Sequence, residues 1–147
     1  MVVVQEADFD LAVEYQKLTE NNAQDGAVVT FIGRVRDFNQ GQGVTGLTLE
    51  HYPGMTEKAL KGIEQKAKER WPINRVTIIH RVGSLKICDQ IVFVGISSPH
   101  RESAFAATEF IMDYLKNDAP FWKKETTKQG CHWVEAQQKD KDALKKW

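Results

Sequence analysis

The sequence has few cysteines and no excess of charge, and both shortages exclude whole classes of protein. Its two cysteines, Cys88 and Cys131, lie far apart and form no CxxC pair. That spacing excludes a disulfide framework and a cysteine-rich zinc site, and it is typical of a reducing compartment. Twenty Lys and Arg residues balance twenty Asp and Glu residues, whereas a general nucleic-acid or membrane-surface binder is usually basic. Any recognition of anions must therefore be local.

Long apolar runs are also absent. No stretch of the sequence approaches the roughly 20 apolar residues that a membrane-spanning helix needs. The N-terminal segment "MVVVQEADFD" lacks the basic and apolar regions of a signal peptide. The chain has 147 residues, of which 41% are hydrophobic and 27% are charged, a profile typical of one globular domain at residues 1–147. We therefore expect a single-domain cytoplasmic protein without a membrane segment.

The spacing of apolar residues predicts an α+β chain, with helices covering a mixed or antiparallel sheet. Alternating or β-branched stretches predict strands at residues 1–5, 25–35, 44–52, 74–83, 90–98, 121–127 and 131–136. Helical spacing predicts helices at residues 9–18, 56–70 and 97–118, with Thr56 and Ser98 as N-caps. The first helix is expected to bury Leu11, Tyr15 and Leu18. Residues 36–43 are predicted to form a polar loop, and residues 139–147 a solvated tail.

Two basic residues stand at the start of the third predicted helix. His100 and Arg101 lie in its first turn, where the helix dipole disfavours positive charge. The free N–H groups at the same end favour an anion. The pattern therefore indicates a phosphate or carboxylate site, although Arg101 could instead pair with an acid such as Glu102.

A second basic pair, Arg34 and Arg36, ends a predicted strand and leads into the glycine-rich loop. Strand alternation predicts that both side chains lie on the same face. The GxxxxGK[ST] pattern of a phosphate loop is missing. The pair therefore indicates either a second anion contact or a hairpin with solvated arginines.

Two lysines surround an apolar corner in the stretch "MDYLKNDAPFWKKETT". Lys116 ends the third helix, and Lys123 follows Phe121 and Trp122. A lysine beside apolar groups has a lowered pKa and becomes usable as a proton donor, base or nucleophile. The alternative is that Lys116 complements the helix C-terminus and that Lys123 faces water.

The histidines show no metal-ligand spacing. His80 lies in an apolar strand, which favours a structural histidine whose hydrogen bonds are satisfied.

Taken in order, these motifs resemble the family of molybdopterin synthase large subunits, the MoaE family. The resemblance lies in the stretches "DGAVVTFIGRVR", "LTLEHYPGMTEKAL", "RWPINRVTIIHRVG", "IVFVGISSPHRESAF", "FIMDYLKNDAPFWKKE" and "WVEA". They run from Asp25 to Ala136, most of the chain, and "EHYPGM", "HRVG" and "APFWKKE" are the most specific of them.

The resemblance implies an α/β hammerhead-type fold with an additional antiparallel β-subdomain. It also implies a sulfurtransferase of molybdenum cofactor biosynthesis that converts precursor Z, a cyclic pyranopterin monophosphate, into molybdopterin. The sulfur would arrive as a thiocarboxylate on the C-terminal glycine of a small ubiquitin-like (MoaD type) subunit. No cofactor would be needed in this subunit. Together with the apolar strand "QIVFVGI", the resemblance favours a homodimer within a heterotetramer.

Carried over by motif, Lys116 and Lys123 match the family's catalytic lysines, and Arg36, His100 and Arg101 match its substrate-binding residues. The same motifs add Arg34, Val35, Lys124 and Glu125 to the residues expected to bind substrate. Some relatives carry an arginine after "WVEA" that contributes to the pocket of the neighbouring subunit, whereas this chain has the uncharged Gln137.

Two other functions fit the same residues less completely. A scaffold or phosphate-ligand subunit that lost the chemistry would not need both lysines, the arginines and His100. A nucleic-acid-binding module is disfavoured by the balanced charge.

Overall fold

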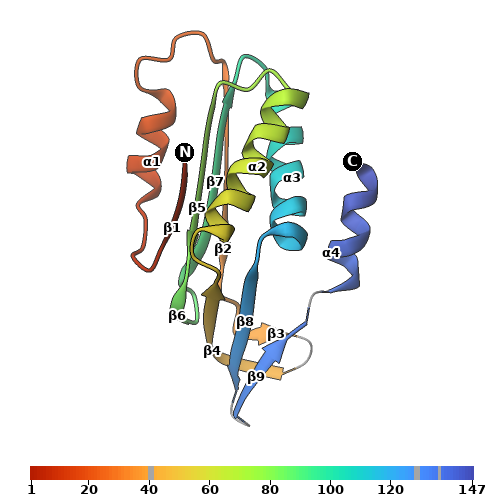
Figure 1. Ribbon diagram of the computed structural model, residues 1–147. Coiled ribbons are helices and arrows are strands. Elements are labelled where there is room, and N and C mark those ends of the chain that lie inside the picture. Colours follow the sequence, from red (N-terminus) through yellow and green to blue (C-terminus); the bar gives the residue numbers. More distant parts are fainter. Residues whose placement is uncertain (40–41, 128–129, 136) are drawn as a thin grey trace.

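The computed structural model describes residues 1–39, 42–127, 130–135 and 137–147. It places two sheets end to end, with helices packed around the first of them (Figure 1). The first sheet has four strands in the order β1 (Val2–Gln5), β5 (Arg75–Arg81), β7 (Gln90–Ser98) and β2 (Ala27–Arg34). β1 pairs with β5 in parallel, and the other neighbours are antiparallel. The α+β prediction is thereby confirmed.

Helices cover both faces of this first sheet (Figure 1). Helix α1 (Leu11–Thr19) packs on one face through a cluster that includes Leu18 and Phe93. Helices α2 (Met55–Arg70) and α3 (Arg101–Asp118) cover the other face and form the larger core. Strand β7 lies in the interior of the sheet and is almost wholly buried within its own chain. Its apolar sequence therefore reflects the core of the chain and offers no surface for a dimer.

The second sheet is smaller and is built around one long strand. β4 (Gln42–His51) pairs with β3 (Phe38–Asn39), with β8 (Phe121–Thr127) and with the short β6 (Gly83–Lys86). β9 (Gly130–Val134) extends the sheet on the far side of β8. Among the described residues, its core cluster contains four buried residues, Val35, Leu47, Leu49 and Leu85. This second sheet corresponds to the additional antiparallel subdomain that the resemblance implied.

The C-terminal segment has no buried residue, which agrees with the predicted solvated tail, but it also forms regular structure that packs on the rest of the chain, which was not predicted. It forms helix α4 (Gln138–Ala143) and a 3-10 turn, η1 (Leu144–Lys146). The Trp147 ring packs edge-on against Trp71 and Phe110, and its Nε1 donates a hydrogen bond to Asp113 Oδ2 at 2.8 Å. These contacts hold α4 beside the C-terminal half of α3.

Four further predictions of local structure were wrong. Helix α2 begins at Met55 with Gly54 as N-cap, so Thr56 lies inside its first turn. In α1, Leu11 and Tyr15 are exposed and only Leu18 of the predicted face is buried, because the Asp10 N-cap and the packing on Phe93 turn a different stripe inward. Helix α3 begins at Arg101 with His100 as N-cap, so Ser98 still belongs to β7. The predicted loop at 36–43 contains β3 and the start of β4; its residues Gln40 and Gly41 lie outside the described part of the chain, as does Ala136 of the last predicted strand.

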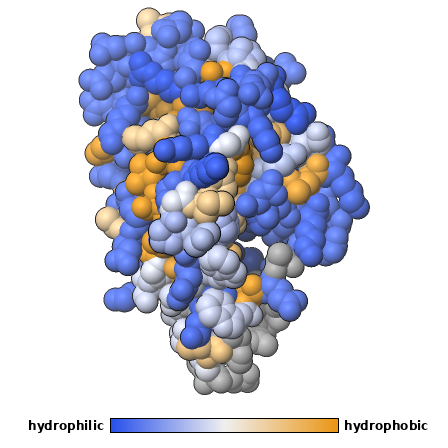
Figure 2. Space-filling model, in the orientation of Figure 1, coloured by the Kyte–Doolittle hydropathy of each residue, from blue (hydrophilic) through white to orange (hydrophobic). Residues whose placement is uncertain are grey.

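No helix in the described part of the chain is long and apolar enough to cross a membrane. The face in Figure 2 is mostly hydrophilic, with small areas of apolar side chains between the polar ones.

Candidate active site

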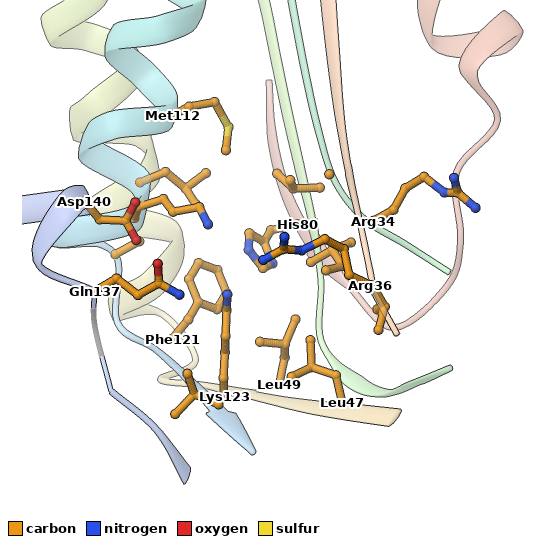
Figure 3. A pocket seen from close by; sticks show the side chains of 18 of the residues that line it. Arg34, Arg36, Leu47, Leu49, His80, Met112, Phe121, Lys123, Gln137 and Asp140 are labelled. Atoms are coloured by element: carbon orange, nitrogen blue, oxygen red, sulfur yellow. The ribbon is translucent and has the colours of Figure 1, made fainter. Parts of the chain in front are cut away.

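A cavity of about 290 Å³ lies where the two sheets meet the C-terminal end of α3. Its wall combines apolar side chains, among them Leu47, Leu49, Met112 and Phe121, with basic ones such as Arg36 and Lys123 (Figure 3). Of the expected site residues, the cavity wall includes Arg34, Val35, Arg36, Lys116, Lys123 and Glu125, and it also includes Gln137. The structure therefore brings together most of the residues that the sequence motifs indicated.

Lys116 and Lys123 reach this cavity from a helix and from a strand. Helix α3 ends at Asp118, and Pro120 leads the chain directly into β8. Strand alternation then places Phe121, Lys123 and Glu125 on the face of β8 that lines the cavity. Burial lowers the pKa of Lys123, and the charge of Lys116 lowers it further, which places the two ammonium groups in one electrostatic environment. The predicted turn at Pro120 thus brings the lysines to one pocket.

Strand alternation predicted that the two arginines near the end of β2 share one face, but in the structure they do not. The pairing of β2 with β7 shifts register between Gly33 and Arg34, and the strand ends there. Figure 3 shows the Arg36 side chain directed toward His80 and the Arg34 side chain directed away from it. Arg34 Nε donates a hydrogen bond to the Cys88 carbonyl at 3.3 Å. Arg36 is therefore the arginine available to a ligand in the cavity.

Val35, between them, is a buried core residue. Its backbone N–H donates to the Asp89 carbonyl, and its carbonyl accepts from the Cys88 N–H. Val35 therefore ties the end of β2 to the segment before β7 and shapes the cavity wall.

Lys124 and Trp122 lie on the face of β8 that does not line the cavity, because they alternate with Lys123. Lys124 packs over the Trp133 ring, with its Nζ 5.6 Å from the ring centroid. Trp122 is half exposed. The expectation that Lys124 contributes to the same pocket is therefore not met within this chain.

His100 and Arg101 lie at the other end of α3 from Lys116. Fifteen residues separate Arg101 from Lys116, which corresponds to about 22 Å along an α-helix. Neither residue lines the cavity of its own chain. Within one chain, therefore, the predicted convergence of Arg36, His100 and Arg101 does not occur. The alternative pairing of Arg101 with Glu102 is not seen among the described ion pairs either.

Two parts of the cavity wall, His80 and the C-terminal segment, were not predicted from the sequence. His80 lines the cavity beside the lysines, and so do Gln137 and Asp140 of the C-terminal segment. Asn117 Nδ2 donates to the Asp140 carbonyl at 2.6 Å, which holds α4 at this wall. Alternation along β5 from Val76 and Ile78 was the signal that could have placed His80 on the sheet face covered by α2 and α3. No comparable signal marked Asp140, because its position depends on long-range packing of Trp147.

Among the described residues, no group of three or more His, Cys, Asp or Glu side chains comes together to hold a metal ion. The cavity wall combines basic side chains with the carboxylates of Glu125, Glu135 and Asp140. The charges of Asp140 and Glu125 act on the pKa of Lys123 in the direction opposite to burial.

Comparison with known proteins points to one family. Residues 4–118 match the family described as MoaE protein. The Escherichia coli protein named molybdopterin synthase catalytic subunit is 57% identical over 146 residues, which cover 99% of this chain and 97% of that one. The solved structure of the molybdopterin biosynthesis MoaE protein from Burkholderia ambifaria has a TM-score of 0.85 at 51% identity, over 100% of this chain and 97% of that one.

A more distant structure shows the same fold. It is titled a protein–protein complex of subunits 1 and 2 of molybdopterin-converting factor from Helicobacter pylori, and it matches with a TM-score of 0.75 at 18% identity. The match covers 91% of this chain and 90% of that one. The matched family and the high identity over nearly the whole length agree with the resemblance read from the motifs, and the chain belongs to the MoaE family.

Proposed function

We propose that this protein is the catalytic subunit of molybdopterin synthase. It transfers two sulfurs to precursor Z, a cyclic pyranopterin monophosphate, and so forms the dithiolene of molybdopterin. The observation that carries the proposal is the meeting of Lys116, Lys123 and Arg36 in one cavity with an apolar wall. The named relatives support the same assignment.

The sulfur comes from a second protein in this proposal. A small ubiquitin-like subunit of the MoaD type carries a thiocarboxylate on its C-terminal glycine and inserts this tail into the cavity. A thiocarboxylate is an anion, and two lysines and an arginine at the cavity favour its approach. The Helicobacter pylori complex of two converting-factor subunits supports a partner of this kind. This subunit then needs no cofactor of its own, and the reaction takes place in the cytoplasm.

The proposed chemistry develops negative charge at two places. Attack by the sulfur opens the cyclic phosphate, and cleavage of the acyl group passes through an oxyanion. Positive groups already in place stabilise such charge without reorganisation. Arg36 binds the phosphate, and Lys116 stabilises the acyl oxyanion or the carboxylate that is left behind. Lys123, whose pKa is lowered by burial, exchanges the proton or transiently holds the acyl group.

A second copy of the chain completes the anion site in this proposal. Because His100 and Arg101 lie at the far end of α3 from their own cavity, only another chain can bring them to it. The exposed edge strand β2, with Phe31, and the exposed Phe105 on α3 offer apolar surface for such a dimer. Light scattering should therefore give a dimer for this chain alone and a heterotetramer with the small subunit.

The decisive experiment is reconstitution. Purified protein, thiocarboxylated small subunit and precursor Z should yield dithiolene product at two sulfurs per pterin. The matched control uses small subunit with an ordinary C-terminal carboxylate, which should give no product. Binding of both partners without any dithiolene would contradict the proposal and leave a scaffold subunit.

A further inference from the structure

His80 lines the cavity from β5, where the preceding residues Ile78 and Ile79 are buried and apolar. It alternates with Val76 and Ile78 on β5, so its side chain lies on the sheet face covered by α2 and α3. The ring is 5% exposed. It stacks on Phe121 with ring centroids 3.8 Å apart and an interplanar angle of 18°. Two neighbouring elements therefore fix the orientation of the imidazole.

The hydrogen bonding of the ring determines which nitrogen carries the proton. His80 Nδ1 lies 2.8 Å from the Arg81 carbonyl oxygen, and a carbonyl oxygen only accepts. Nδ1 therefore donates, and in the neutral ring Nε2 is an acceptor. In the described part of the chain no donor lies within hydrogen-bond distance of Nε2. Among the described residues the fully enclosed side-chain atoms without a partner are Glu14 Oε2 and Asn22 Oδ1, and Nε2 is not one of them. His80 lines the cavity, so a bound molecule or water there can donate to Nε2.

The surroundings keep this acceptor free of a proton. Burial lowers the pKa of His80 to about 4, and the charges of Lys123 from β8, Lys116 from α3 and His51 from β4 act in the same direction. At neutral pH the cavity thus presents a neutral acceptor beside two cationic donors. Figure 3 shows the Lys123 amine and the Arg36 guanidinium both directed toward the His80 ring.

That combination suits the cleavage of an acyl–sulfur bond by water. If the thiocarboxylate sulfur attacks the pterin, the product is a thioester that joins the small subunit to the pterin. Its release requires water to add to the acyl carbon. An oxyanion then needs cations, and the water needs an acceptor for its proton.

We propose, on the basis of the function proposed above, that His80 Nε2 accepts the proton of the water that hydrolyses this thioester. The water oxygen bonds to the acyl carbon, and the carbon–sulfur bond breaks with its electron pair left on the pterin as a thiolate. One proton of the water passes to Nε2, and the other leaves as the new carboxylic acid ionises. The anions then present in the cavity stabilise the protonated ring until it returns its proton to solvent.

Two substitutions separate this role from a structural one. In His80→Asn, the side-chain amide can still donate to the Arg81 carbonyl, but nothing replaces Nε2. In His80→Gln, an amide oxygen can accept a hydrogen bond from the water at the place of Nε2 and so orient it, but it cannot take up the proton, and the Nδ1 donor is lost. A structural role predicts that His80→Asn is the milder change. The proposed role predicts that it is the more damaging one.

The test is a single-turnover reaction of each variant with thiocarboxylated small subunit and the cyclic pterin phosphate, quenched in acid and followed by mass spectrometry. His80→Asn should form the small subunit–pterin thioester at the wild-type rate and hydrolyse it at least about a hundredfold more slowly. His80→Gln should hydrolyse it faster than His80→Asn. Thermal unfolding confirms that each variant is folded. If only one variant folds, accumulation of the small subunit–pterin thioester in that variant still tests the proposal.

The outcomes distinguish this inference from the function on which it depends. Wild-type protein that makes no dithiolene overturns the proposed function. Wild-type turnover with normal thioester hydrolysis in His80→Asn overturns only the role of His80. Weaker pterin binding without adduct also overturns it, and would make Nε2 a contact for a donor group of the pterin.

Discussion

The two sheets of this molecule are built from the same kinds of strands but differ in what covers them. The first sheet has helices on both faces, and its strands β5 and β7 are almost continuously buried. The second sheet has a four-residue core and leaves Trp122 and Trp133 exposed. The cavity lies at the boundary between the two sheets. His80 and Lys116 belong to the first sheet and its helices, and Lys123 belongs to the second sheet. The comparison shows that a first sheet with a large core carries part of the site, and a second sheet with a small core completes it.

The largest expected effect is on stability and concerns the first sheet. Phe93 is fully buried between α1 and the first sheet, with its ring centroid 5.7 Å from that of Phe9. Replacing it by alanine should lower the free energy of unfolding by about 3–5 kcal/mol. Native-state hydrogen exchange should show the whole first sheet opening more easily. In Leu49→Ala, faster exchange should be confined to the second sheet. If hydrogen exchange became faster throughout the molecule in both variants, the two sheets would not differ in local stability.

The next effect is a pH dependence that comes mainly from the burial of His80 in the first sheet, with a smaller contribution from Lys123 and His51 of the second sheet. The pKa of His80 is about 4 in the folded chain and about 6.5 when unfolded. Between these values the unfolded chain holds a proton that the folded chain lacks, so stability falls as pH falls from 6.5 to 4. The loss should reach about 3 kcal/mol across the window, at about 1.36 kcal/mol per pKa unit. Chemical denaturation at several pH values should show this slope in wild type and a flatter one in His80→Asn. Parallel curves would contradict it.

Substitution of the two lysines tests whether the cavity between the two sheets is the active site. Lys116→Ala and Lys123→Ala should each reduce turnover at least about a hundredfold, or about 2.7 kcal/mol of barrier. The melting temperature should barely change, because neither side chain belongs to a core cluster. Lys124→Ala is the matched control, because Lys124 lies on the opposite face of the same strand, over Trp133. Near-normal rates in both lysine variants, or an equal loss in the control, would contradict the assignment.

The smallest effect concerns the two arginines at the end of β2. Arg36→Ala should weaken binding of the pterin phosphate by about 1.5–3 kcal/mol, the range for a hydrogen bond to a charged group. Arg34→Ala should change the affinity much less, because its side chain is directed away from His80 and bonds to the Cys88 carbonyl. Calorimetric titration measures both. An unchanged affinity for Arg36→Ala would place the phosphate elsewhere.

Much of the fold followed from local patterns in the sequence. The apolar spacing of Ala104, Ala107, Ile111 and Leu115 predicted α3 and its buried face, which the structure has. Pro120 follows the end of that helix and leads the chain into β8, so the meeting of Lys116 and Lys123 at one cavity could be predicted. Features that depend on distant contacts could not. Helix α4 is short and highly charged, and its position depends on Trp147 packing against Trp71 and Phe110.

The site was predicted only in part for similar reasons. A register shift after Gly33 is not visible in the alternation of β2, and it is what separates Arg34 from Arg36. The motif that contains His100 and Arg101 indicated anion binding, but it did not show that these residues lie at the opposite end of α3 from Lys116. His80 was assigned a structural role, since an apolar strand does not reveal that one ring nitrogen lacks a partner.

The length of α3 has a consequence for mixtures of defective subunits. In the proposed dimer, each α3 has Lys116 in its own cavity and Arg101 in that of its neighbour. Lys116→Ala and Arg101→Ala subunits would each be impaired alone. Unfolded and refolded together, they would form hybrid dimers in which both lesions fall in one cavity and the other is intact. Such a mixture should regain activity through complementation between the two parents, whereas sites built within single chains would regain none.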